Sequence, residues 1–241
     1  MVVAEGASLY HLDMNLLLDG VTGIEHNVPV APLYDDVLQL WSGTPVGYTL
    51  TLNVNYGGLS GETYWYQQSE VWQHPLLSRY VPPRVLQPRA VRRLMAPESE
   101  YAALKDSSAA GKALAERGIH VNIGAHGQRE GLGSHWEIWS FALGGMSPMQ
   151  ALETGTMAPA RHLGMDRDLG SIEAGKLADL VILDANPLED IHNTDRVERV
   201  MLNGRLYDAD TLNETVTGAS DLEPLYWHLE PQVNLLTTPL D

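Results

Sequence analysis

Apolar and polar positions along the chain predict short strands that alternate with helices. In residues 35–41, Val37, Leu38 and Trp41 fall on one helical face, and residues 9–18 are dense enough in apolar side chains for a helix that ends at Gly20. Strands alternating with helices favour an α/β fold with a parallel sheet. The predicted strands are residues 2–4, 22–26, 48–54 and 119–125.

Three features predict the elements that follow. A helix should begin near Pro97 and run to residue 117, with a possible break at Ser107, and another should cover residues 134–143. Ser147, followed by Pro148 and by Gln150 at the third helical position, is typical of a capping box. Gly164 should end that helix.

The last third changes character. Residues 178–184 and 197–202 read as strands, and Asn203–Gly204 predicts a tight hairpin turn into residues 205–207. Beyond residue 215 the chain is irregular.

Residues 56–97 show little periodicity but hold many aromatic side chains and prolines. We expect a long loop, which is often a functional lid. Its aromatic side chains could line an apolar substrate pocket or cover an open sheet edge. They are Tyr56, Tyr64, Trp65, Tyr66, Trp72 and Tyr80.

Composition narrows the classes of partner and metal. The net charge of −16, from 31 acidic and 15 basic residues, disfavours nucleic acid and anionic membranes. Because there is no cysteine, a metal must be held by His, Asp, Glu or carbonyl oxygen. The first residues carry no basic region or long apolar run, so a cytoplasmic protein without a signal peptide is expected.

The run from Gly170 to Asp184, with Ile172-Glu173-Ala174-Gly175-Lys176 inside it, resembles the C-terminal signature of the amidohydrolase superfamily. Residues 197–207 resemble the next part of that signature. The branch it is most similar to is the imidazolonepropionase- and prolidase-like amidohydrolases, and only their C-terminal part is present.

The resemblance implies strands five to eight of a (β/α)8 barrel, at residues 2–6, 23–26, 48–58 and 119–127. The expected fold is thus α/β: a truncated half TIM-type barrel plus a small C-terminal β segment. We expect the half barrel at residues 1–165, with the aromatic loop at 56–97, the β segment at 166–215 and an irregular tail at 216–241.

The chain departs from the family pattern in several places. The His-x-His pair of the family's first strand is absent, and the three lysines, Lys105, Lys112 and Lys176, do not correspond to its carboxylated lysine. His126 stands where the family's eighth strand usually has Asp. Val3 takes the usual ligand position of strand five, with Glu5 two residues further on the same side.

In barrel enzymes the chemistry lies at the carboxyl ends of the strands, where we expect Glu5, His26 and His126. One carboxylate and two imidazoles suit zinc or another divalent metal with a position left for water. Such a water would attack an amide, ester or related acyl bond of a small-molecule substrate. Each side chain also has a structural interpretation: a solvated charge for Glu5, and strand-end histidines for the others.

The segment after the fourth predicted strand adds further candidates. Arg129 could bind a substrate carboxylate, and Tyr56 and Trp136 could also contact the substrate. His135 and Glu137 could act as acid and base. The structural alternative is a capping box between Ser134 and Glu137.

Two other functions stay open. A half barrel has open strand edges, which predicts a homodimer or higher homo-oligomer. The chain could then be a non-catalytic, self-associating fragment. It could also be a metal-independent residual hydrolase that uses His126 with Glu5 or Glu137.

Overall fold

A four-stranded parallel sheet organises the first part of the computed structural model, which describes residues 1–6, 8–129, 131–218 and 222–229. The strands lie side by side in the order in which they occur in the sequence, and each one pairs in parallel with the next. This confirms the predicted α/β fold with a parallel sheet. The strands are β1 (Val3–Glu5), β2 (Gly23–Glu25), β3 (Gly47–Thr49) and β4 (Val121–Asn122).

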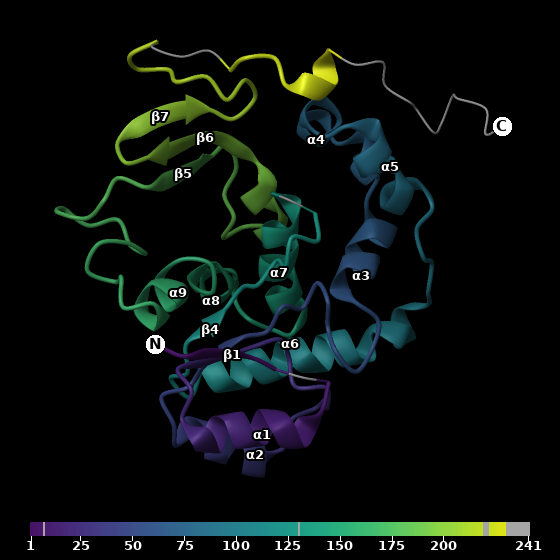
Figure 1. Ribbon diagram of the computed structural model, residues 1–241, viewed down its shortest axis with the longest axis vertical. Helices are drawn as coiled ribbons and strands as arrows, with labels where there is room; N and C mark the ends of the chain where they lie inside the picture. The colour runs from purple at the N-terminus through teal and green to yellow at the C-terminus, as the bar shows by residue number, and fades with distance from the viewer. Residues whose placement is uncertain (7, 130, 219–221, 230–241) are drawn as a thin grey trace.

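The first two crossovers each use the helix that the pattern predicted. Helix α1 (Tyr10–Asp19) ends at Gly20, which adopts a left-handed conformation with φ of 74°. Helix α2 (Asp35–Ser42) buries Val37, Leu38 and Trp41. Both helices lie together below the sheet in Figure 1.

Strands β3 and β4 are shorter than the predicted segments 48–54 and 119–125. After β3 the chain turns, and Thr51 has a positive φ of 55°. Leu50 and Leu52 are nevertheless fully buried, and Thr51 and Asn53 are buried as well. The segment therefore stays in the core after strand pairing has ended.

The prediction of a loop over residues 56–97 is wrong. This segment folds into short helices, and Pro75 and Pro83 begin two of them, at first-turn positions where proline is favourable. Tyr64, Trp65 and Tyr66 belong to the core and are no more than 8% exposed. The helices are α3 (Gly61–Gln68), η1 (Val71–Gln73), α4 (Pro75–Tyr80) and α5 (Pro83–Val91).

The helices around β4 match the sequence more closely. Helix α6 follows η2 and continues through Ser107 without a break. Helix α8 has the predicted capping box, because Ser147 and Gln150 bind each other's backbone amides. Gly164 follows a separate short helix, α9. These elements are η2 (Glu98–Tyr101), α6 (Ala102–Ala115), α7 (Leu132–Leu143), α8 (Pro148–Glu153) and α9 (Met157–His162).

A three-stranded antiparallel sheet forms the C-terminal part, at the top of Figure 1. Asn203 and Gly204 both have positive φ, 48° and 78°, which confirms the predicted hairpin turn. The segment docks on α7, where the Trp139 indole donates to Thr194 at 2.8 Å. Its elements are β5 (Leu180–Leu183), η3 (Ile191–Asp195), β6 (Val197–Leu202) and β7 (Arg205–Asp208), followed by η4 (Tyr226–His228) in the tail.

In the part of the chain that the structure describes, no helix combines the length and the apolar composition needed to cross a bilayer.

Candidate functional site

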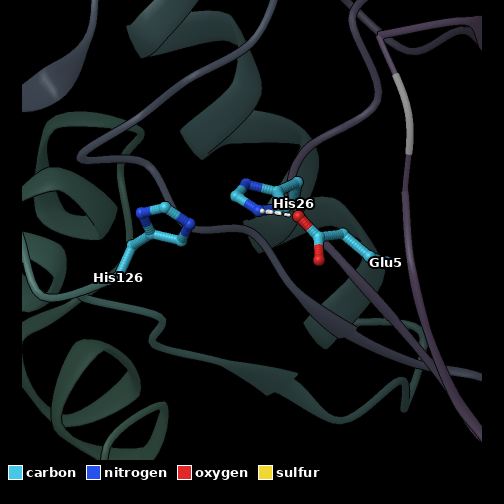
Figure 2. Close-up of side chains that lie close together, drawn as sticks. All are labelled: Glu5, His26 and His126. Carbon is cyan, nitrogen blue, oxygen red and sulfur yellow. Dashed lines mark ion pairs between the residues drawn. The ribbon is translucent and has the colours of Figure 1, made fainter.

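Glu5, His26 and His126 come together at the carboxyl ends of the parallel strands. Glu5 ends β1, His26 follows β2, and His126 lies beyond β4. Their ligand atoms all lie within 4.8 Å of one another. The Nε2 atom of His26 lies 3.2 Å from a Glu5 carboxylate oxygen, and the rings of His26 and His126 are 5.0 Å apart (Figure 2). The structure thus assembles the three candidates that the sequence singled out as a metal site.

The backbone at this edge of the sheet is unusual. His26 and His126 both have positive φ, 72° and 55°, a conformation that few residues other than glycine adopt. Such strain persists where the surrounding structure enforces it, and it concentrates at functional sites. At His26 it also ends the strict side-to-side alternation of β2.

The three side chains share an open cavity of about 230 Å³ with Glu25, Thr51 and Gly124. Glu25 is the functional candidate that sequence reasoning missed. Strand alternation places Glu25 and His26 on opposite faces, but the left-handed turn at His26 brings both to the cavity. The parallel register, which only the structure shows, sets Glu25 beside Glu5.

Electrostatics at the site favour a neutral imidazole beside carboxylates. Burial, reinforced by the neighbouring His126, lowers the pKa of His26, although Glu5 opposes the shift. Burial also raises the pKa of Glu25, with Glu5 adding to this effect and a Thr49 hydrogen bond opposing it. A neutral imidazole offers the lone pair that a metal requires.

The donor set fits a divalent metal. Two imidazoles and one carboxylate are the ligand types of catalytic zinc sites, which leave one position for water. Glu5 is exposed and His26 is 4% exposed, so the site reaches solvent while one ligand is held rigidly. The Nδ1 atom of His26 is buried without a hydrogen-bond partner in the described chain.

Tyr56 lies at this site, as the sequence suggested. Its ring stacks on His26, with the centroids 4.8 Å apart and an interplanar angle of 22°. The Asn27 side chain holds the loop in place: it accepts from the Tyr56 amide at 2.6 Å and donates to the Tyr56 carbonyl at 2.9 Å.

Arg129 lies outside the cavity. It is 5% exposed, and its Nε atom donates to the Tyr66 hydroxyl at 2.8 Å. The guanidinium also lies 5.7 Å from the centroid of the Tyr66 ring. In this position Arg129 ties the loop after β4 to α3.

Glu137 is fully buried, away from the cavity, and the capping box with Ser134 is wrong. Helix α7 begins after Gly131 without a side-chain cap. The Glu137 carboxylate instead accepts from the backbone amides of Leu52, at 3.0 Å, and Asn53. Burial raises its pKa to about 8 against the effect of these hydrogen bonds.

His135 and Trp136 also lie away from the cluster. Trp136 is 1% exposed and packs on Tyr66, with ring centroids 5.0 Å apart. The His135 ring lies near Trp139, on the side of α7 that carries the C-terminal segment. Its pKa is lowered by burial, which Asp195 opposes. Neither joins Glu5, His26 and His126.

Parallel β/α units with candidate ligands at the carboxyl ends of the strands are the arrangement that β/α-barrel enzymes use for their active sites. The family model for the amidohydrolase family matches residues 74–207, more than half of the chain. This chain therefore belongs to the amidohydrolase family. The matched region contains His126 but not Glu5 or His26.

Curated relatives match short segments. An imidazolonepropionase of Shouchella clausii (strain KSM-K16) is 41% identical over 64 residues, which are 25% of this chain and 14% of that protein. An adenine deaminase 3 of Rhizobium meliloti (strain 1021) is 44% identical over 48 residues, 19% of this chain and 8% of that protein.

Solved structures share the fold over most of the chain. A Xaa-Pro dipeptidase with bound methionine is 24% identical with a TM-score of 0.58, and covers 86% of this chain and 44% of its own. A molinate hydrolase is 19% identical with a TM-score of 0.59, and the match covers 99% of this chain and 46% of that one. This chain thus spans less than half the length of these proteins.

Proposed function

We propose that this chain is a metal-dependent hydrolase of amide, ester or related acyl bonds in small molecules. The observation that carries the proposal is the convergence of Glu5, His26 and His126 within 4.8 Å at the carboxyl ends of the strands. Membership in the amidohydrolase family supports it.

Glu5, His26 and His126 would hold the metal, with zinc as the first candidate. A bound divalent cation supplies an acidified water as nucleophile and polarises the scissile carbonyl. His26 is held by burial and by the stacked Tyr56 ring, which limits its rotation. Glu5 lies on the open side and can adjust to an arriving ion.

Substrate would enter through the cavity beside Tyr56. The exposed part of this ring offers an apolar surface next to the ligand atoms, while Glu25 and Thr51 offer polar contacts. Arg129 could bind a substrate carboxylate only if it broke its hydrogen bond to Tyr66, so we assign it no role in the initial binding of substrate.

The four parallel strands correspond in this proposal to the second half of a barrel. Solved relatives about twice as long support this interpretation. Strand β1 is an edge strand, and apolar side chains are exposed at its start: Val2, just before it, at 65% and Val3 at 42%. Such an edge invites pairing, so we propose a homodimer or higher homo-oligomer. Light scattering that gives a stable mass of 26.5 kDa would contradict it.

Zinc content tests the proposed function. The purified protein should bind zinc near one equivalent per chain, and His26→Ala should lose it. His11→Ala is the matched control, because His11 lies exposed on α1 and outside the cluster. Ester and amide hydrolysis that disappears with chelator and returns with zinc supports the enzyme. A protein that binds no metal but hydrolyses these substrates favours the metal-independent alternative, and one that does neither favours the non-catalytic fragment.

A further inference from the structure

A chain of polar side chains leads from α5 to His126. Arg89 donates from Nη1 to the Gln128 side-chain oxygen at 2.8 Å. The same Nη1 atom lies 3.3 Å from a carboxylate oxygen of Glu62, at the start of α3. The Gln128 side-chain nitrogen lies 3.5 Å from Nδ1 of His126. No local pattern in the sequence indicates this chain of contacts, because its members come from three separate parts of the fold.

The chemistry of arginine fixes which way the Gln128 amide faces. A guanidinium has only donors, so the group it meets at 2.8 Å must be the amide oxygen. Turning the amide over would set two donors against each other. The NH2 group of Gln128 is therefore the part that faces His126.

The amide orientation decides where His126 carries its proton. A neutral imidazole has one donor nitrogen and one acceptor nitrogen. With the NH2 group of Gln128 at 3.5 Å, Nδ1 of His126 is placed to accept a hydrogen bond, an arrangement that favours the proton on Nε2. Figure 2 shows one ring nitrogen of His126 turned toward His26 and Glu5 and the other turned away. The nitrogen turned toward the cluster is Nε2.

We propose that Arg89 and Gln128 are positioning residues that hold His126 as the Nε2–H tautomer, with the proton directed at the cluster. This state opposes metal binding through Nε2, which puts the proton on Nδ1, where the NH2 group of Gln128 offers it no acceptor. Gln128 thus lowers the metal affinity of the site instead of raising it. The statement about metal affinity rests on the proposed function, whereas the tautomer does not.

Substitution at Gln128 separates this proposal from an ordinary supporting role. In Gln128→Glu the carboxylate accepts from both Arg89 and Nδ1–H, so the tautomer reverses and zinc affinity rises by about tenfold or more. In Gln128→Met the opposing donor is gone, so zinc affinity holds or rises. A supporting partner would instead cost about 10- to 100-fold in affinity when removed. Arg93→Met, two residues beyond the end of α5, is the control for the change in net charge, because Arg93 pairs with Glu70.

Two measurements decide the matter. Nitrogen-15 NMR of the metal-free protein at pH 8, with His126→Gln to assign the signals, should show Nε2–H at His126 in the native chain and Nδ1–H in Gln128→Glu. An Nδ1–H signal in the native chain overturns the proposal. Zinc affinity is measured by competition with a chromophoric chelator, and a tenfold loss in Gln128→Met overturns it as well. If no variant binds zinc, the proposed function fails, and the NMR result still decides the tautomer.

Discussion

Glu137→Gln replaces a fully buried carboxyl group with a neutral amide, with little change in shape. The native side chain is 0% exposed and accepts from the amides of Leu52 and Asn53, with a longer contact to the Gly124 amide at 3.5 Å. Two effects oppose each other here. Burial disfavours the charged carboxylate, and the amide hydrogen bonds favour it.

Burial dominates, since the pKa of Glu137 is raised from its ordinary value of 4.5 to about 8. The folded state therefore holds a proton that the unfolded chain releases above pH 4.5. This contribution to stability is fully present below pH 4.5 and is lost as the pH rises through 8. At about 1.4 kcal/mol per pKa unit, it amounts to roughly 5 kcal/mol over that range.

Urea unfolding monitored by tryptophan fluorescence between pH 5 and pH 8.5, with chelator present, measures this effect. The native chain and Glu137→Gln share every other titrating group, so their difference isolates Glu137. We expect the variant to gain stability relative to the native chain as the pH rises. If the native chain instead gains on the variant with rising pH, the amide hydrogen bonds outweigh burial and the reasoning is wrong.

Three further substitutions test the packing and the local signals by urea or thermal unfolding. Gly47→Ala would place a methyl group against the His162 ring, so it should lower stability by about 1–3 kcal/mol, and Gly47→Ala combined with His162→Ala should cost less than the two single changes together. Gly204→Ala puts a side chain on a residue with φ of 78° but with open space around it, so it should cost about 1–2 kcal/mol from backbone strain alone. Ser147→Ala removes the capping box of α8 and should lower the free energy of unfolding by about 1 kcal/mol. An unchanged stability would mean that the capping box does not stabilise the fold.

Much of the fold could be predicted from local signals. The helix end at Gly20, the capping box at Ser147 and the turn at Asn203 each depend on residues within one turn of chain. The prediction for residues 56–97 failed because the aromatic side chains there follow no single period, and because two of the prolines, Pro75 and Pro83, begin helices.

The residues of the candidate site were likewise predicted only in part from the sequence. Glu5, His26 and His126 could be proposed because each closes a predicted strand, and parallel strands present their carboxyl ends at one edge. Glu25 was missed because strand alternation does not foresee a left-handed residue at the strand end.

The sequence by itself determined the order of the strands, most of the helices outside residues 56–97, the family and the three residues of the candidate metal site. Only the tertiary structure decided what the neighbouring polar residues do. Glu137 does not cap its own helix but accepts hydrogen bonds from backbone amides 84 and 85 residues earlier in the sequence. Arg89 donates to Gln128, which lies 39 residues further along the chain. A buried carboxylate must find donors wherever the fold places them, and no local pattern encodes a partner at that distance.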